Sequence, residues 1–526
     1  MKKIFPILFL FYFVCLEAQT PQILWWFDTD DSAFGQTAMG DITGDGNLNL
    51  VFGCYRNDSM IYALNAVDGS LLWKFNASGA GEGCNDVAAL IHDVDQDGVV
   101  DVVVPSSCNP KTFCFNGSTG ALKWTANTRG SDSPPTVVDL DGDGDLEILH
   151  GQFGGYVICI NGNDGSIKWE ILVDPNSWIQ TAPTIVDLDG DGQLDFVVAT
   201  WHFSDNNKIY AYKGDDQTLL WSYDLADYVY HGTAVADLTK DGKPELIIGD
   251  YSGKLYVFKG ETGDTLWTFD AGYYIGSPVS VADLNGDGYC NLVFTSYFKV
   301  FALNHDGSIL WQYNIPGIGQ SFRGAALSDV DNDNLPDVIF GTSGGQLIGL
   351  KGTTGLPLWT VDLAAHYGDV LEIDHAPVVG DFNNNEILDV FVVGGNTSYP
   401  NFQDNYGRGY AVEVGTGAGP DWPMFQYDIY RTGNLCALQQ ASIPVIQKNE
   451  LNVYPNPAEK GSILYLSANN DLNGAMVTFK EITGRILYSE VVKNHTCKIP
   501  NHLPEGLYIL SLSAEESSFS TKLIVQ

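Results

Sequence analysis

Residues 187–195 read Asp187-Leu-Asp189-Gly-Asp191-Gly-Gln-Leu-Asp195, with a carboxylate at positions 1, 3, 5 and 9 of a nine-residue segment. Eight related segments follow one another at steps of 46 to 52 residues. Repetition on this scale is typical of solenoids and propellers. The sequence therefore predicts eight copies of one structural unit. The acidic segments begin at Asp41, Asp93, Asp139, Asp187, Asp237, Asp283, Asp329 and Asp381.

A second motif keeps the same phase. An Asp-Gly or Thr-Gly turn is followed by a short strand with one tryptophan, as in Asp164-Gly-Ser-Ile-Lys-Trp169. An eighth copy, Leu24-Trp25-Trp26-Phe27, precedes the first acidic segment, and the last repeat has no tryptophan strand of its own. The N-terminal strand can fill that gap, which would close a ring without open edges. The other seven tryptophans are Trp73, Trp124, Trp169, Trp221, Trp267, Trp311 and Trp359.

Each repeat is predicted to form four short strands, with the acidic segment between the first and the second. In the fifth repeat we expect strands at 233–236, 245–249, 254–258 and 265–269. About 48 residues per four-stranded unit fits a propeller blade. A β-solenoid is the competing architecture, but it usually has shorter repeats and no joining of the two ends. We therefore predict an all-β chain with an eight-bladed β-propeller over residues 20–434.

The acidic segments predict calcium sites. Calcium prefers six to eight oxygen ligands, and positions 1, 3, 5 and 9 are oxygen donors. Position 7 varies, as expected of a backbone ligand, and position 6 is usually glycine, which a tight loop favours. Aspartate-rich turns that bind nothing are the alternative, but clustered carboxylates repel one another without a cation. We expect up to eight structural Ca²⁺ ions.

The eight segments differ in the number of carboxylates at these four positions. The segments at Asp93, Asp139, Asp187 and Asp329 have four, and the segment at Asp237 has three. We therefore expect graded affinity, with the segment at Asp381 weakest or empty. The predicted metal ligands are Asp41, Thr43, Asp45, Asn49, Asp93, Asp95, Asp97, Asp101, Asp139, Asp141, Asp143, Glu147, Asp187, Asp189, Asp191, Asp195, Asp237, Thr239, Asp241, Glu245, Asp283, Asn285, Asp287, Asn291, Asp329, Asp331, Asp333, Asp337, Asp381, Asn383, Asn385 and Asp389.

The N-terminus is predicted to be a signal peptide over residues 1–19. Lys2 and Lys3 precede an apolar run at 4–14, which is too short to span a bilayer. Cys15 raises the alternative of a lipoprotein, but the bulky residues before it do not suit lipid attachment. No later segment has 18 consecutive apolar residues. We therefore expect a soluble mature protein without a transmembrane segment.

A second, smaller unit is predicted at the C-terminus. Residues 435–450 have the composition of a linker, and residues 451–526 are expected to form a small immunoglobulin-like β-sandwich. This unit contains Pro455-Asn456-Pro457, Gly506-Leu-Tyr508 and a final Lys522-Leu-Ile-Val525. An accessory module without a role in export is the alternative interpretation.

These motifs resemble known families. The acidic segments between short strands resemble the FG-GAP, or VCBS-type, calcium repeats of integrin-type propellers. The turn-and-tryptophan strands resemble the blades of pyrroloquinoline-quinone-type eight-bladed propellers, which implies that each tryptophan docks between blades. The C-terminal motifs resemble the type IX secretion (Por) sorting domain. This last resemblance implies Gram-negative export, contact with the secretion machinery, and a secreted or outer-surface protein.

Charge and cysteines narrow the possible partners. The chain has 65 acidic and 26 basic residues, a net charge of −39, which argues against a nucleic-acid partner. Eight cysteines follow the signal peptide, and an exported chain permits disulfides. The connectivity does not follow from the sequence. Candidate pairs are Cys108 with Cys114, Cys54 with Cys84 and Cys436 with Cys497, whereas Cys159 and Cys290 are expected to be buried thiols.

The connections at the ends of the strands away from the acidic segments carry aromatic, histidine and arginine side chains. Rings with a few polar partners suit stacking on sugars or contact with a protein. The alternative is that most of these rings only pack between blades. The candidate ligand-binding residues are Trp178, Trp201, His202, Tyr230, His231, Tyr251, Tyr274, Tyr297, Arg323 and His375.

From these features we predict a monomeric binding or adhesion module for a glycan or a surface protein, without a catalytic site. The alternatives are a lyase-like enzyme acting on polysaccharides and a relative of quinone-dependent dehydrogenases. The dehydrogenase lacks support because there is no adjacent cysteine pair and no Cys-x-x-Cys-His. No motif joins the histidines and Arg323 into a lyase site. Fold alone does not choose among these functions.

Overall fold

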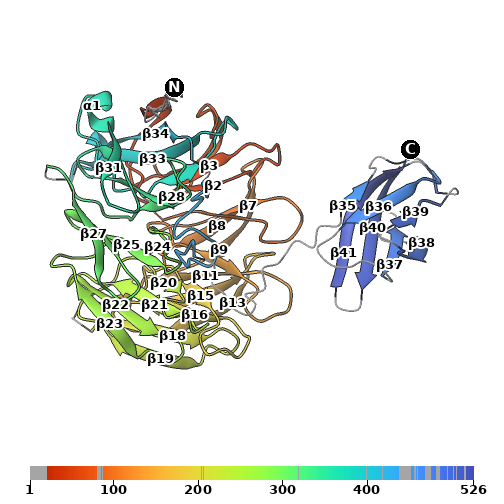
Figure 1. Ribbon diagram of the computed structural model, residues 1–526, viewed down its shortest axis with the longest axis horizontal. Coiled ribbons are helices and arrows are strands. Elements are labelled where there is room, and N and C mark those ends of the chain that lie inside the picture. Colours follow the sequence, from red (N-terminus) through yellow and green to blue (C-terminus); the bar gives the residue numbers. More distant parts are fainter. Residues whose placement is uncertain are drawn as a thin grey trace, which may run out of the picture. The chain divides into compact units, whose positions relative to one another are not determined.

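Two compact units, residues 1–440 and 441–526, make up the computed structural model (Figure 1). The structure describes 20–436 apart from 80–83, 86, 203, 205, 318, 399 and 418. In the second unit it describes 452–525 apart from 455–457, 459, 468–474, 481–485, 494–495, 501–502, 505 and 515–516. The predicted signal peptide, residues 437–450 of the predicted linker and the Pro455-Asn456-Pro457 motif lie outside the described residues.

The first unit contains eight four-stranded antiparallel sheets, each a blade; in seven of them the strands follow chain order, and in the eighth the N-terminal strand completes the sheet. Blade 1 is β2 (Ala38–Gly40), β3 (Asn49–Gly53), β4 (Met60–Asn65) and β5 (Leu71–Asn76). Blade 2 is β6 (Leu90–His92), β7 (Asp101–Pro105), β8 (Lys111–Asn116) and β9 (Leu122–Asn127). Blade 3 is β10 (Thr136–Val138), β11 (Glu147–Gln152), β12 (Tyr156–Asn161) and β13 (Ile167–Leu172). Blade 4 is β15 (Thr184–Val186), β16 (Asp195–Ala199), β18 (Lys208–Lys213) and β19 (Leu219–Asp224).

The remaining blades repeat this order. Blade 5 is β20 (Ala234–Ala236), β21 (Glu245–Gly249), β22 (Lys254–Lys259) and β23 (Thr265–Asp270). Blade 6 is β24 (Ser280–Ala282), β25 (Asn291–Ser296), β26 (Lys299–Leu303) and β27 (Ile309–Asn314). Blade 7 is β28 (Ala326–Ser328), β29 (Asp337–Gly341), β30 (Gln346–Leu350) and β31 (Pro357–Asp362), followed by α1 (Leu363–Tyr367). A two-stranded ribbon, β14 (Ser177–Trp178) with β17 (Trp201–His202), lies outside these sheets.

Blade 8 joins the two ends of the propeller sequence. It consists of β32 (Val378–Gly380), β33 (Leu388–Asn396), β34 (Tyr406–Gly415) and the N-terminal strand β1 (Gln22–Thr29), with η1 (Phe402–Asp404) before β34. Strand β1 pairs antiparallel with β34, as predicted. The ring of Phe391 lies 5.6 Å from both Trp25 and Phe52, so blade 8 packs against blade 1. The predicted all-β propeller is confirmed.

Six of the eight tryptophans of the outer strands donate their indole N–H to a backbone carbonyl of the next blade. Trp25 Nε1 donates to the carbonyl of Ala66 at 3.0 Å, and Trp124 Nε1 donates to that of Gly162 at 2.9 Å. The ring also covers the turn glycine of the next blade: a Cβ on Gly69 would lie 2.4 Å from the Trp25 ring. Gly69 has a φ of 71°, which other residues seldom adopt. The Asp-Gly turn and the tryptophan are therefore two halves of one joint between blades.

A segment after blade 8, residues 419–436, lies among the first strands of the blades, and we call it the central segment. Its carbonyls accept backbone N–H groups from blades 1, 3, 4, 5, 6, 7 and 8. These donors are Met39, Val137, Ile185, Val235, Val281, Asp329 and Val379. The central segment therefore binds the inner edge of seven blades along their first strands.

The C-terminal unit consists of two small sheets. One contains β35 (Asn452–Tyr454), β36 (Ile463–Ser467) and β39 (Thr496–Lys498). The other contains β37 (Met476–Lys480), β38 (Ile486–Val491), β40 (Gly506–Ala514) and β41 (Ser517–Val525). Leu464, Val477 and Phe479 lie in the shared core, as expected for the predicted β-sandwich. Among the described residues there is no helix long and apolar enough to span a bilayer.

The disulfides differ from the candidate pairs. Cys84 is bonded to Cys108, and Cys290 is bonded to Cys436. Cys114 lies on β8 with its side chain in the core, so the turn pairing with Cys108 is wrong. Cys54 is a buried free thiol, as is Cys159, for which this was predicted. Cys290, predicted to be a thiol, instead ties the end of the central segment to blade 6.

Candidate functional site

The eight acidic loops share one backbone design, built by the side chain at position 1. In every loop the backbone N–H of position 6 donates to one carboxylate oxygen of position 1, at distances such as 3.0 Å from Gly192 to Asp187. Position 6 has a positive φ throughout, including 66° at Glu386. Glu386 stands at a position where most loops have glycine. It keeps the common turn, at the cost of a strained backbone.

Positions 9 and 5 fix the rest of the loop. One side-chain oxygen of position 9 accepts the N–H of position 2 in all eight loops, as in Leu188 to Asp195 at 2.9 Å. One oxygen of position 5 accepts the N–H of position 7, as in Gln193 to Asp191 at 2.9 Å. Each of these side chains keeps a second polar atom for other contacts.

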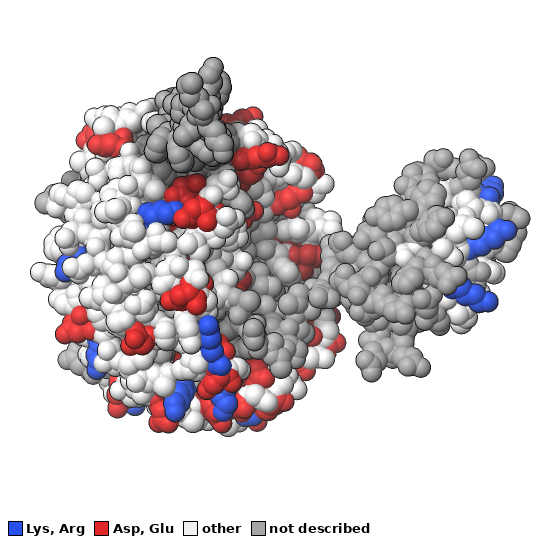
Figure 2. All heavy atoms as spheres, in the orientation of Figure 1, with Lys and Arg blue, Asp and Glu red and all other residues white. Residues whose placement is uncertain are grey.

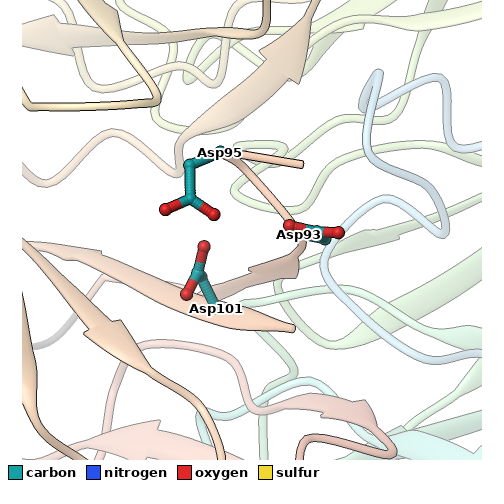
Figure 3. Close-up of side chains that lie close together, drawn as sticks. All are labelled: Asp93, Asp95 and Asp101. Carbon is teal, nitrogen blue, oxygen red and sulfur yellow. The ribbon is translucent and has the colours of Figure 1, made fainter. Parts of the chain in front are cut away.

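Carboxylates converge in four of the loops. Oxygens of three acidic side chains lie within 4.8 Å of one another in the loops at Asp93, Asp139, Asp187 and Asp329. In Figure 3 the carboxylates of Asp95 and Asp101 face each other, with Asp93 beside them. These are the four loops with carboxylates at all four positions. Clusters of this kind could hold a metal ion, and their all-oxygen donor set is compatible with calcium.

Buried position-9 carboxylates lie at the base of these loops. Burial raises the pKa of Asp195 and Asp337 to about 7, and that of Asp101 to about 6. The acidic neighbours of Asp195 raise its pKa further. A nearby cation favours the ionised form of such groups. Buried oxygens of Asp95 and Asp139 have no hydrogen-bond donor among the described residues. Buried oxygens without a donor are suited to coordinate a cation in these loops.

Four lysines, which the sequence analysis did not single out, reach into these same four loops. Each ammonium group contacts at least two of the predicted metal ligands. The lysines are Lys123, Lys168, Lys213 and Lys351. Figure 2 shows basic side chains directly beside acidic ones along the lower rim of the propeller. The repeated motif does not include these lysines, because they lie on or directly after the third strand, or on the fourth strand, 22 to 30 residues after the first residue of the acidic segment.

The three loops with two carboxylates use amides and hydroxyls instead. Asn291 bonds to Asn304 at 3.2 Å, and Thr43 bonds to Asp41 at 3.3 Å. In the last loop one buried oxygen of Asp389 and the side-chain oxygen of Asn383 have no hydrogen-bond donor among the described residues. Burial raises the pKa of Asp389 to about 7. The last loop therefore has the same backbone conformation as the others, with an acceptor oxygen at its base that has no donor among the described residues.

The opposite ends of the strands carry a continuous row of aromatic rings, which we call the aromatic row. It runs through Trp201, Tyr228, Tyr251, Tyr274 and Tyr297 and crosses blades 4, 5 and 6. Successive ring centroids lie 4.1, 4.4, 5.1 and 5.1 Å apart, and all five side chains are half-buried. Because neighbours cover one another's faces, the row offers mainly ring edges and hydroxyl groups.

Arg323 and Tyr230 lie beside this row. The Arg323 guanidinium is 4.9 Å from the centre of the Tyr230 ring, which contacts Trp201 edge-on at 5.3 Å. Phe322, which sequence analysis left out, contacts Tyr230, Tyr251 and Tyr274. Trp178 pairs with Trp201 across the ribbon of β14 and β17, and its ring packs against Phe153 at 4.4 Å. Six of the ten candidate ligand residues thus form one surface: Trp201, Tyr230, Tyr251, Tyr274, Tyr297 and Arg323.

The three histidines of the candidate set are buried. His231 packs against Phe322 and Phe425, and burial lowers its pKa. Ser204 donates its backbone N–H to His202 Nδ1 at 3.1 Å. Thr37 donates its backbone N–H to His375 Nε2 at 2.9 Å. Their side chains do not reach the surface, so we leave them out of the proposed contact surface.

We expect His375 to make stability depend on pH. Burial, with repulsion from Arg323, lowers its pKa to about 3, so between pH 6.5 and about 3 only the unfolded chain binds the proton. Stability is therefore lost as pH falls through this range, by about 1.4 kcal/mol per unit. Urea unfolding of the wild type and His375→Gln at pH 7.5, 6 and 5 tests this. Titratable groups present in both proteins cancel in the difference between their free energies of unfolding. A constant difference would contradict it.

Three family models match parts of the chain. The model described as FG-GAP-like repeat matches residues 93–150 and 139–198. The model described as outer membrane protein assembly factor BamB matches residues 205–422. The model described as secretion system C-terminal sorting domain matches residues 452–526. No curated protein matches the chain.

Solved structures resemble the propeller at low sequence identity. Sqt1 of Saccharomyces cerevisiae has a TM-score of 0.54 and 12% identity, over 76% of this chain and 100% of that chain. Quinohemoprotein alcohol dehydrogenase ADHIIG of Pseudomonas putida HK5 has a TM-score of 0.50 and 14% identity, over 76% and 77%. The C-terminal WD40 domain of Sif2 has a TM-score of 0.50 and 13% identity, over 76% and 99%. At these identities the likeness concerns the fold alone.

Proposed function

We propose that this chain, a β-propeller of FG-GAP-like and BamB-like repeats with a type IX secretion sorting domain, is a calcium-stabilised binding module that works outside the cell. The sorting domain indicates type IX export, with secretion or attachment to the outer surface. In this proposal the acidic loops rigidify one face of the propeller. The opposite face holds a ligand.

Calcium supports the fold in this proposal and takes no part in chemistry. The loops at Asp93, Asp139, Asp187 and Asp329 would bind most tightly, because three carboxylates converge in each. The other four loops would bind more weakly, through the ligands named above. A divalent cation joins the first two strands of each blade, and a ligand that binds only the folded state stabilises it.

The observation that carries the binding proposal is the aromatic row with Arg323 at its side. Tyrosine and tryptophan combine an apolar body with a polar tip, which suits contact surfaces. Buried acceptors of Gln180 and Asp374, which precede the first strands of blades 4 and 8, have no hydrogen-bond donor among the described residues. Ring edges, phenol groups, a guanidinium and such acceptors favour a hydroxyl-rich ligand, so a glycan is the first candidate and a protein the second.

Binding to a panel of immobilised neutral and acidic polysaccharides tests this proposal. We expect Trp201→Ala and Tyr251→Ala to weaken binding by about 30-fold or more, the effect of removing an aromatic anchor. Tyr289→Ala is the matched control, because this half-buried tyrosine stacks on His305 in an acidic loop of the opposite face. No polysaccharide binding, or equal loss in the control, would count against a glycan ligand at this surface.

The same polysaccharides also test the enzyme alternative. A lyase would release products with a new double bond, which absorb ultraviolet light. His231 and His375, two of the three candidate histidines, are buried, and His375 Nε2 accepts the backbone N–H of Thr37. We therefore expect binding without release of unsaturated products. Their appearance would overturn the non-enzymatic proposal.

A further inference from the structure

The lysines in the acidic loops come from two places in the blade. Lys123 and Lys168 lie on the fourth strand, directly before the docking tryptophan. Lys213 ends the third strand of blade 4, opposite Asp195, and Lys351 follows the third strand of blade 7. Two different backbone positions thus deliver an ammonium group to the same part of the loop.

A lysine stands at one of these two positions only in the loops that have three or four carboxylates. Each loop with four carboxylates has one lysine at one of the two positions and none at the other, where Asn or Leu stands. The loop with three carboxylates has Lys259, which lies opposite Glu245 in the strand register, as Lys213 lies opposite Asp195. The three loops with two carboxylates have no lysine at either position. Their residues there are Asn65 and Leu72, Asn304 and Leu310, and Glu413 and Leu24.

The ammonium groups lie among the predicted metal ligands. Lys123 Nζ is 2.5 Å from Asp95, 3.2 Å from Asp97 and 3.0 Å from Asp101. Lys168 Nζ is 2.8 Å from Asp141 and 2.7 Å from Glu147.

The other two lysines make the same kind of contact. Lys213 Nζ is 3.1 Å from Asp189 and 2.6 Å from Asp191. Lys351 Nζ is 2.5 Å from both Asp331 and Asp333. Because these oxygens are the ones a metal ion would need, the ammonium and the ion compete for them.

Counting formal charges shows what the lysines change. Counted at positions 1, 3, 5 and 9 alone, a loop with four carboxylates has a charge of −4, and its lysine reduces this to −3; the loop with three goes from −3 to −2. At the same positions the loops with two carboxylates have −2, without a lysine. The lysines thus reduce the difference in formal charge among the loops. They do so in the loops where repulsion between carboxylates would be largest.

We propose that Lys123, Lys168, Lys213 and Lys351 are internal cations that keep the acid-rich loops folded without calcium, and that calcium displaces their ammonium groups. This inference rests on the proposed calcium sites. It implies that these loops bind calcium less tightly than their carboxylates alone would allow, because binding includes the work of displacing a lysine. It also gives the exported chain folded loops before it meets calcium.

The test compares two variants, each with four Lys→Met substitutions, in the full chain. The first changes Lys123, Lys168, Lys213 and Lys351. The control changes Lys111, Lys208, Lys254 and Lys299, which begin the third strands of blades 2, 4, 5 and 6, at the opposite face. Both lose four positive charges, so their long-range attraction for calcium is the same. Lys208 and Lys213 are also equally exposed, at 28% and 29%.

Two quantities are measured: calcium affinity, by competition with a chromophoric chelator, and the melting temperature in EDTA. We expect the first variant to bind calcium roughly tenfold more tightly at four sites and to melt several degrees lower in EDTA, relative to the control. Lys213→Met against Lys208→Met repeats the comparison with one substitution each. Unchanged or weaker calcium affinity in folded Lys213→Met would overturn the displacement.

The outcomes separate this inference from the proposed calcium sites. No calcium binding by the wild type would remove the calcium sites, and with them the displacement. Calcium binding by the wild type, with equal affinity in the two four-lysine variants, would leave the calcium sites standing and refute the role of the lysines.

Discussion

Chelation of calcium lowers the melting temperature of the full chain by about 10 °C or more, in the largest change we expect from any single treatment. Each site held at a calcium concentration one hundred times its Kd contributes about 2.7 kcal/mol. The four loops in which carboxylates converge together contribute about 11 kcal/mol on this basis. A degree or more per kcal/mol is the order expected for a large domain.

The measurement is a thermal melt in millimolar calcium and in EDTA, monitored by differential scanning fluorimetry or circular dichroism. Magnesium in place of calcium serves as the ionic control, since its stricter octahedral geometry suits these loops less well. The double variant Asp187→Asn, Asp189→Asn should lack the part of the change in melting temperature that one site contributes. Superimposable melts in calcium and EDTA, with no calcium retained on metal analysis, would show the loops to be aspartate-rich turns.

Arg431→Met is expected to be the most destabilising single substitution. Arg431 is fully buried in the central segment and donates to the carbonyl of Pro135 at 2.6 and 3.0 Å and to that of Phe425 at 2.8 Å. Burial lowers its pKa to about 10, so it stays charged at neutral pH. Methionine would leave both carbonyls without this donor and would remove the positive charge near the half-buried Asp428. We expect a loss of about 3–5 kcal/mol.

Urea unfolding in saturating calcium measures this loss. Arg129→Met is the matched control, because Arg129 pairs with Glu170 at the surface, where such pairs contribute at most about 1 kcal/mol. Equal stability of the two variants would show that the central segment binds the blades without Arg431. The comparison also tests whether the central segment belongs to the cooperative unit of the propeller.

Repetition made most of the fold predictable. The period of the acidic segments gave the blade number, and the position of Trp25 ahead of the first segment located the strand that completes blade 8. Strand bounds in blade 5 came within a residue or two, because the alternation of turn and apolar residues recurs eight times. A single copy of such a short pattern would not have supported these predictions.

Contacts between repeats that occur only once in the chain were not predictable from the repeated motifs. The disulfide between Cys290 and Cys436 joins residues 146 positions apart, and the pairing of Cys84 with Cys108 depends on where two loops meet. His375 looked like a ligand residue by its place in a connection, but the packing of blade 8 turns it inward to Thr37. The central segment has no repeat to reveal it, since each of its residues meets a different blade.

The amino-acid sequence by itself determined the eight blades, the acidic loops, the tryptophan joints and the sorting domain, because each depends on residues close together in the chain or on a spacing repeated many times. Only the tertiary structure decided which lysines enter the loops, which rings form the aromatic row, and which cysteines bond. Those features depend on side chains brought together by the curvature of the sheets and the order of the blades, and no local pattern encodes a distance across two strands.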